Sequence, residues 1–332
     1  MNSNLIFKQK RIEIRNHLEK TYNNNIAHDA LRGLTAQQKY IPSKYFYDSR
    51  GSRLFDEICC LPEYYPTRTE MSILEQASTK IMSSFKRGDI VELGSGANRK
   101  IRLLLDSVSK SSRTDYRYVP VDVSQSALIS ASEELLEMYP ELEVFGIVAD
   151  FTAHLEAIPS ERPRLIIFLG STIGNFNERE RTDFLRLLAA SMKPEDRVLI
   201  GFDMIKPGKT LEAAYNDSRG ITSAFNKNLL NVLNRELNAE FDPSRFTHVA
   251  FFNEERGRVE MHLQAKQDME VNVNDLELTV EFNKYETIHT EICSKFSKED
   301  IRKMAAEAGL GIQQWFFDPK GWFSLTELML ER

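Results

Sequence analysis

The stretch Asp89–Lys100, DIVELGSGANRK, constrains the fold of this chain more than any other. A short apolar run in it ends at an acidic residue and two closely spaced glycines, Gly94 and Gly96. This pattern is typical of a buried parallel strand that enters a tight turn and then a helix. Glycines in such a turn have no Cβ, so a bound ligand can approach the backbone. We therefore predict the first strand of a doubly wound sheet, with a ligand at its carboxyl end.

Helix and strand patterns alternate through the middle and at the end of the chain. Ser124 and Ser297 are predicted to cap two of the helices. Five buried strands separated by helices imply a mostly parallel, doubly wound sheet, and a turn at Asp318–Gly321 adds a terminal hairpin. We predict strands at 89–94, 116–122, 143–150, 163–170 and 196–204, with further helices near 69–86, 98–110 and 177–193.

Other segments do not follow that alternation. Residues 1–35 are predicted to be a polar helix with a sparse apolar stripe formed by Ile12, Ile14, Leu18 and Tyr22. Residues 41–76 are dense in aromatic side chains and broken by prolines, which fits equally a loop-rich piece packed on a core or a lid over a ligand. Helical patterns at 209–240 and strand patterns at 245–290 predict an insertion or a second domain after the fifth strand.

Composition narrows the classes of partner. The 332 residues carry a net charge of -6 and no basic run, which argues against nucleic acid. The longest apolar runs have the length of a strand, which argues against a membrane span. The three cysteines and six histidines lack the spacing of a metal site, so we expect no metal. Adjacent Cys59 and Cys60 form a poor disulfide pair, and we expect a cytoplasmic protein.

The glycine turn also bears on the kind of cofactor. A dinucleotide fingerprint needs a third glycine for close packing of helix on strand, and this chain has Arg99 there. An NAD-dependent oxidoreductase is therefore disfavoured. S-adenosylmethionine has no pyrophosphate and needs room for a sulfonium and an amino-acid tail, which Glu92, Gly94 and Gly96 supply. Lys100 is either a partner for the carboxylate of that tail or a solvated helix lysine.

Polar residues at the ends of later strands fit the same cofactor. Asp122 suits a ribose diol, and Asp150 beside Phe151 suits an adenine. Each aspartate alone fits a helix cap as well, but the pair at successive strand ends favours the cofactor. Asn175 lies in the turn after the fourth strand and has both a donor and an acceptor with which to hold a carboxylate.

Five stretches of the sequence carry a family resemblance. They are YFYDSRGSRLFDEICCLPEYYPTRTE, VELGSGANRK, FLGSTIGNF, GFDMIKPGKTLEAAYND and TEICSKF, and they span almost the whole chain in the expected order. The chain resembles the L-histidine Nα-methyltransferases of the ergothioneine pathway, which use S-adenosyl-L-methionine to convert histidine to its trimethyl betaine, hercynine. This resemblance implies an α/β fold with a Rossmann-like class I methyltransferase domain (70–205 and 296–332) and an α+β substrate-binding domain (1–69 and 206–295).

The resemblance also implies roles for single residues. Those expected to hold the substrate carboxylate are Asn175 and Tyr215, and those expected to hold the imidazole are Glu291 and Cys293. Tyr65 and Met261 are implied as pocket walls, Gly170 as a neighbour of the amine, Tyr47 as the candidate catalytic phenol, and Gly94, Lys100, Asp122, Asp150 and Phe151 as the cofactor set.

One position departs from the family pattern, which has serine where this chain has Cys293. A thiol is a weaker hydrogen-bond partner than a hydroxyl, so histidine binds less tightly, another ring is preferred, or Cys293 only packs. The alternatives are therefore the same chemistry on tryptophan or a thiohistidine, or a non-catalytic protein that binds S-adenosylmethionine. We expect a monomer with L-histidine as its small-molecule partner.

Overall fold

The chain divides into two compact units, and each is described by itself. The computed structural model describes residues 5–9, 11–18, 24–96 and 98–331. The first unit is formed by Met1–Glu19, Arg68–Met204 and Phe296–Arg332, and the second by Lys20–Thr67 and Ile205–Lys295. Among the described residues, no helix combines the length and the apolar character that crossing a membrane requires.

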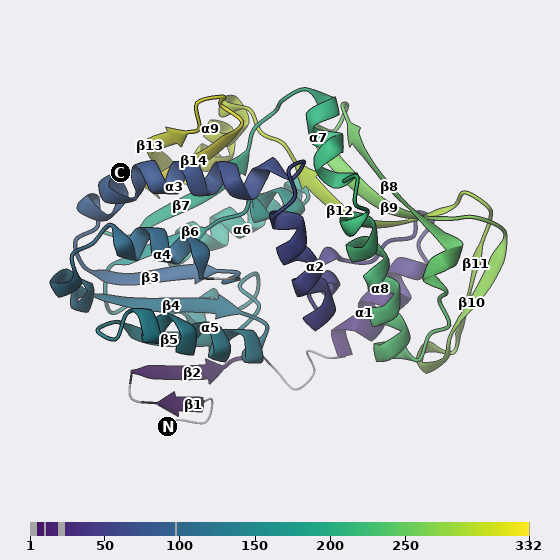
Figure 1. Cartoon of the computed structure of the whole chain (residues 1–332), viewed down its shortest axis with the longest axis horizontal. Helices are drawn as coiled ribbons and strands as arrows, with labels where there is room; N and C mark the ends of the chain where they lie inside the picture. The colour runs from purple at the N-terminus through teal and green to yellow at the C-terminus, as the bar shows by residue number, and fades with distance from the viewer. Residues whose placement is uncertain (1–4, 10, 19–23, 97, 332) are drawn as a thin grey trace. The chain divides into compact units, whose positions relative to one another are not determined.

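The described residues of the first unit form a nine-stranded sheet in the order β1-β2-β5-β4-β3-β6-β7-β14-β13 (Figure 1). The strands from β2 to β7 in that order pair in parallel, and the terminal hairpin pairs antiparallel with β7. The five predicted parallel strands and the terminal hairpin are confirmed. The strands are β1 (Leu5–Gln9), β2 (Ile12–Asn16), β3 (Gly88–Leu93), β4 (Tyr116–Asp122), β5 (Glu143–Val148), β6 (Arg164–Phe168), β7 (Arg197–Asp203), β13 (Leu310–Phe317) and β14 (Phe323–Leu330).

Helices cover both faces of this sheet because its central strands are apolar on both sides. Along β3, Ile90 and Val91 enter two different hydrophobic cores. The first core also contains residues of α3 (Tyr65–Ser84), α4 (Arg99–Asp106) and α5 (Gln125–Met138), and the second contains residues of α6 (Glu178–Ser191) and α9 (Lys298–Glu307). Ser124 caps α5 and Ser297 caps α9, as the sequence predicts.

The predicted helix over residues 1–35 is wrong for most of the described part of that segment. β1 and β2 form a hairpin, and β2 pairs in parallel with β5 at the edge of the sheet. Ile12 and Ile14 alternate with charged residues and are 3% and 0% exposed, which is the period of a strand with one buried face. Among the described residues of this segment, helix is found in α1 (Asn24–Leu34). The predicted apolar position Tyr22 lies outside the described residues.

The second unit combines helices with small antiparallel sheets. The predicted strands at 245–290 are confirmed: among the described residues, β12, β9 and β8 form one sheet, and β10 and β11 a second. The aromatic segment is helical rather than loop-rich, since it contains α2 and the start of α3. The elements are α2 (Ser49–Cys59), α7 (Gly208–Tyr215), α8 (Ile221–Leu237), β8 (Phe246–Asn253), β9 (Arg258–Ala265), β10 (Met269–Val273), β11 (Leu278–Phe282) and β12 (Thr287–Ser294).

A buried ion pair joins the start of β6 to the residue just before β7. Arg164 and Asp196 are 2% and 0% exposed. Asp196 accepts hydrogen bonds from the backbone N–H, Nε and Nη2 of Arg164 at 2.8, 2.9 and 2.6 Å, and from the backbone N–H of Lys193 at 2.8 Å. Removing one partner of such a pair leaves a buried charge that water cannot reach.

We expect Asp196→Ala to lower the free energy of unfolding by about 3–5 kcal/mol, because it leaves the buried Arg164 guanidinium without its carboxylate partner. The matched control is Asp183→Ala, which removes an exposed partner of Arg179 at 3.7 Å and should cost less than about 1 kcal/mol. Urea unfolding of both variants measures the difference. Equal losses would show that the buried pair contributes no more than a surface pair.

Candidate active site

The predicted cofactor residues lie where the parallel strands of the first unit end. Gly94 follows β3, Asp122 ends β4, and Asp150 and Phe151 follow β5. Carboxyl ends of parallel strands meet at one edge of a sheet, which is where open α/β sheets bind ligands. The structure therefore places these four positions along one edge.

The glycine turn after β3 keeps backbone accessible at that edge. Gly94 has a φ of +71°, which favours glycine, and its N–H donates to the carbonyl of Val121 at 2.9 Å. A Cβ at Gly94 would lie 3.6 Å from Cε1 of Phe151, so that ring lies beside the turn. A Cβ at Gly96 would meet no atom of the described residues within 4 Å, apart from its chain neighbours. This open backbone beside an aromatic face fits a ligand with a flat ring and a polar tail.

A buried carboxylate that the sequence analysis missed holds Lys100. Glu70, on α3, is fully buried and lies 2.6 Å from Nζ of Lys100. It also accepts the backbone N–H of Gly170, which follows β6, at 2.8 and 3.0 Å to its two oxygens. A Cβ at Gly201 would lie 2.3 Å from Oε1 of Glu70, so a larger residue there would displace this carboxylate. Lys100 is thus not a solvated helix lysine: Glu70 fixes its ammonium near the turn after β6.

Burial raises the pKa of a second carboxylate at this edge. Glu92 is 6% exposed, and its Oε2 accepts a hydrogen bond of 2.5 Å from the phenol of Tyr118. Loss of solvation raises the pKa of Glu92 to about 7, against the opposing effects of the Tyr118 hydrogen bond and the positive charge of Lys100. Burial therefore favours the protonated form of Glu92 relative to that of an exposed glutamate.

The two aspartates at the strand ends are oriented by their own turns. Oδ1 of Asp122 accepts the N–H of Ser124 at 2.9 Å, and burial raises the pKa of Asp122 to about 6. Oδ1 of Asp150 accepts the N–H and hydroxyl of Thr152 at 2.9 and 2.6 Å. Ser124 rather than Asp122 provides the side-chain cap of α5, so helix capping does not explain Asp122.

Asn175 lies in a short 3-10 turn, Thr172–Asn175, after β6. Ser171, just before it, has a φ of +56°, and its hydroxyl accepts the N–H of Asp203 at 3.0 Å. The turn is thus tied to the end of β7 in the first unit.

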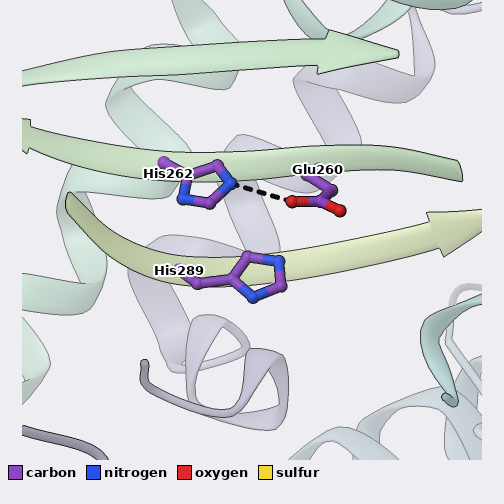
Figure 2. Close-up of side chains that lie close together, drawn as sticks. All are labelled: Glu260, His262 and His289. Atoms are coloured by element: carbon purple, nitrogen blue, oxygen red, sulfur yellow. Dashed lines mark hydrogen bonds and ion pairs between the residues drawn. The ribbon is translucent and has the colours of Figure 1, made fainter. Parts of the chain in front are cut away.

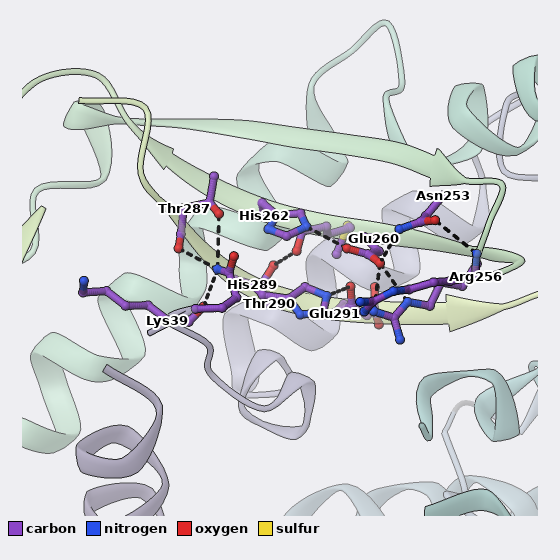
Figure 3. Close-up of polar contacts among 12 residues, drawn as sticks. Lys39, Asn253, Arg256, Glu260, His262, Thr287, His289, Thr290 and Glu291 are labelled. Atoms are coloured by element: carbon purple, nitrogen blue, oxygen red, sulfur yellow. Dashed lines mark hydrogen bonds and ion pairs between the residues drawn. The ribbon is translucent and has the colours of Figure 1, made fainter. Parts of the chain in front are cut away.

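The predicted imidazole site is built on β9 and β12 of the second unit. Glu291 pairs with Met261 and Cys293 pairs with Val259, so these side chains share one face of the sheet. A β-bulge between His289 and Glu291 sets this register, and the ring Nε2 of His289 donates to the Glu291 carbonyl at 3.1 Å (Figure 3). Because of the bulge, His289 and Glu291 face opposite sides of the sheet.

Burial also raises the pKa of Glu291 to about 7, and the positive charge of Lys295 opposes that rise. Lys295, 4% exposed, donates to Sγ of Cys293 at 3.1 Å and to the phenol of Tyr215 at 3.2 Å. The structure therefore joins Cys293 and Tyr215, two predicted substrate residues, through a lysine that the sequence analysis did not single out.

The remaining predicted residues of the second unit lie among aromatic rings. Tyr65 is 1% exposed, and its phenol accepts a hydrogen bond of 2.9 Å from Lys206. Tyr47 is 42% exposed and packs edge-on against Phe55 and Phe225, with ring centroids 5.6 and 5.8 Å apart. Burial raises the pKa of Tyr64 well above its usual value, with smaller effects from Cys59, Cys293, Tyr47 and Glu291, and its ring lies 6.3 Å from that of Tyr215.

Three potential metal ligands gather on the other face of β9 and β12 (Figure 2). Ligand atoms of Glu260, His262 and His289 lie within 4.8 Å of one another. The two imidazoles stack, with centroids 4.6 Å apart and planes 16° from parallel, so one ion cannot lie in both ring planes. Glu260 already accepts hydrogen bonds from Arg258 at 2.8 Å and Asn253 at 3.1 Å (Figure 3). These three residues therefore form a cluster of stacked rings beside a paired carboxylate, and their geometry does not suit a shared metal ion.

Comparison with known proteins matches nearly the whole chain to one family. The family described as histidine-specific methyltransferase, SAM-dependent, matches residues 26–330. A histidine N-alpha-methyltransferase of Mycolicibacterium smegmatis is 44% identical over 298 residues, 90% of this chain and 92% of that protein. One of Mycobacterium tuberculosis is 41% identical over 95% of this chain and 98% of that protein. Ergothioneine biosynthesis protein 1 of Schizosaccharomyces pombe is 32% identical over 70% of this chain and 31% of its own length.

We expect Glu92→Gln to make stability less dependent on pH. The pKa of Glu92 is about 7 in the folded chain, against an ordinary value of 4.5. As pH rises, the folded chain therefore keeps this proton to a higher pH than the unfolded chain does. The contribution of Glu92 to stability is therefore lost as pH rises from about 5 to 7, by about 2–3 kcal/mol. The neutral glutamine avoids that loss and still accepts the Tyr118 hydroxyl.

Urea unfolding between pH 5 and 8 measures this effect, as the difference between Glu92→Gln and the native chain. The control is Glu75→Gln, an exposed position of α3, which should give a profile parallel to the native one. A Glu92→Gln profile that also ran parallel would contradict the assigned pKa.

Proposed function

Because this chain belongs to the SAM-dependent histidine-specific methyltransferases, we propose that it transfers methyl groups from S-adenosyl-L-methionine to the α-amino nitrogen of L-histidine. The reaction has a place in ergothioneine biosynthesis. The finer proposal is that three transfers occur and that hercynine is released. The observation that supports histidine most directly is Glu291, a partly buried carboxylate on the same sheet face as Met261.

The polar groups at the edge of the nine-stranded sheet fit S-adenosyl-L-methionine. Bound there, this cofactor supplies an electrophilic methyl group on a sulfonium. We propose that Asp122 holds the ribose hydroxyls and that Asp150 and Phe151 hold the adenine. The open backbone at Gly94 and Gly96 admits the amino-acid tail.

Lys100 is proposed as the partner of the tail carboxylate. Its ammonium is already fixed by Glu70, so binding does not have to order a flexible side chain. A carboxylate ligand would share this cation with Glu70, and the N–H of Gly170 gives Glu70 a second, independent donor.

Glu291 is proposed to select the imidazole by accepting its N–H. A site built around such a hydrogen bond rejects side chains that lack the donor, because the carboxylate is then left unpaired. Met261, opposite Glu291 in the register, supplies an apolar wall for the ring. Contact of Asn175 and Gly170 with histidine stays a prediction.

The aromatic residues have different parts in this proposal. Lys206 lies 4.5 Å from the ring centroid of Tyr65, so a cation already occupies a face of that ring. Tyr47 is more exposed and is the better candidate to face the growing ammonium, where a cation–π contact stabilises by about 0.5–2 kcal/mol. Its phenol is also the candidate acceptor of the amine proton.

A different amino-acid substrate remains the second candidate because of Cys293. Its Sγ accepts a hydrogen bond from Lys295 at 3.1 Å, so the buried thiol also takes part in a polar chain. Incubation with S-adenosyl-L-methionine and a panel of histidine, tryptophan and a thiohistidine, followed by mass spectrometry, decides between these substrates. We expect histidine alone to gain up to three methyl groups.

A preference for tryptophan in that panel would overturn histidine as the substrate. It would leave Glu291 as the acceptor of a ring N–H, because the indole also carries that donor. Absence of transfer to every amino acid, with S-adenosylhomocysteine still bound, would instead indicate a non-catalytic binding protein.

We expect Glu291→Gln to raise the KM for histidine about 10- to 100-fold, because the imidazole N–H loses a charged acceptor. The dissociation constant of S-adenosylhomocysteine, measured by calorimetry, should stay unchanged. Glu281→Gln, an exposed position on β11, is the matched control and should change neither quantity. A parallel loss of cofactor affinity in Glu291→Gln would sink the assigned role.

A further inference from the structure

Two buried lysines of the second unit each donate to a phenol. Lys206 and Lys295 are 7% and 4% exposed. Their ammonium groups lie 2.9 Å from the Tyr65 hydroxyl and 3.2 Å from the Tyr215 hydroxyl. Each ammonium also lies beside the ring of its tyrosine, 4.5 and 5.1 Å from the centroid. Lysine is rarely buried, because the charge loses its solvation, so these two positions call for a compensating role.

An ammonium on a phenol fixes the direction of the hydrogen bond. Lysine has three donors and no acceptor, whereas a phenol has one donor and acceptor capacity. The Tyr215 oxygen must therefore accept from Lys295, and its own hydrogen points elsewhere as a donor. A donor phenol beside a buried positive charge is suited to an anion, because the hydrogen bond is then charge-assisted.

Lys295 is also the link between the two ends of the predicted substrate site. It contacts Cys293 on one side and Tyr215 on the other, and its charge acts on Glu291. Tyr215 ends α7, whereas Cys293 lies on β12, so a single side chain connects the helix to the sheet face that carries Glu291.

We propose that Lys295 is a positioning residue for the substrate's carboxylate: it holds the Tyr215 phenol as a donor and supplies the positive charge that the carboxylate requires. This inference rests on the proposed function, in which Tyr215 binds the carboxylate. Lys206 has no such role in this proposal: it holds Tyr65, which is proposed as a wall of the pocket and not as a ligand of the carboxylate. The two lysines are buried to a similar extent but have different proposed roles, so one serves as the control for the other.

The test compares L-histidine with L-histidinamide, which keeps the amine and the imidazole but has no negative charge. For Lys295→Met, we expect the KM for histidine to rise about 10- to 100-fold, the loss of one charge-assisted hydrogen bond. The KM for histidinamide should change less than about 3-fold, and kcat for histidine should change little. Lys206→Met is the control and should shift both substrates by the same factor.

A purely structural role of Lys295 would give a different result. The KM values for both substrates would then rise by the same factor, and the melting temperature of the variant would fall. That result would overturn the inference. Tyr215→Phe gives a second approach that keeps Lys295: it should reproduce the selective loss for histidine, and combining it with Lys295→Met should add little further loss. Additive losses in the double variant would also contradict the inference.

The pH profile supplies a readout that packing alone would not move. The ionisable side chains of Lys295, Tyr64 and Cys293 are described near Glu291, and the positive charge of Lys295 lowers the pKa of Glu291. Lys295→Met should therefore shift the Glu291 step in the pH dependence of kcat/KM to higher pH, whereas Lys206→Met should leave it in place. An unmoved step in Lys295→Met would count against the charge coupling.

The outcome is separable from that of the proposed function. Dissociation constants of histidine and histidinamide, measured by calorimetry, give the same comparison without methyl transfer. Native chain that binds histidine more tightly than histidinamide, with this preference lost in Lys295→Met, supports the inference whether or not methyl groups move. Equal affinities of the native chain for both compounds would overturn it.

Discussion

We propose that the cofactor binds at the carboxyl ends of the parallel strands, and the hydrogen-bonded carboxylate of Glu70 holds that edge of the sheet together. This carboxylate is fully buried, and it joins α3 to Lys100 on α4 and to the backbone of Gly170 after β6. Gly201 on β7 leaves the space that this carboxylate occupies. A buried charge of this kind is tolerated only when it is paired and hydrogen-bonded, so the elements around it are held to one arrangement. The position of Lys100 follows from that constraint.

The same rule explains the chemistry of the second unit. Glu291 is partly removed from water, which raises its pKa to about 7, and Lys295 supplies the opposing charge. Lys295 in turn donates to Tyr215 and Cys293, so each polar group is oriented by a neighbour. A substrate with a carboxylate at one end and an N–H at the other matches this distribution of donors and acceptors. We therefore propose that burial and pairing of charges, rather than any single residue, select the ligand.

The sequence was most informative where local pattern decides structure. The apolar strands and the residues at their ends predicted the parallel sheet, since a strand buried on both faces has few alternatives. The hairpin of β1 and β2 was missed because Ile12 and Ile14 alone are too short a pattern to separate period two from a sparse helical stripe. Glu70, Lys206 and Lys295 were missed because their partners lie far away in sequence, at Lys100, Tyr65 and Tyr215. The β-bulge before Glu291 likewise has no local signal.

The central claim is that methyl groups reach the α-amino nitrogen of histidine and no other atom. The most direct measurement uses S-adenosyl-L-methionine with a ¹³C-labelled methyl group and follows the purified chain with L-histidine by NMR. The account predicts that the labelled methyl carbons appear on the α-nitrogen, with the imidazole protons keeping the pattern of an unmethylated ring. Label on a ring nitrogen, or none on histidine while another amino acid is labelled, would contradict it.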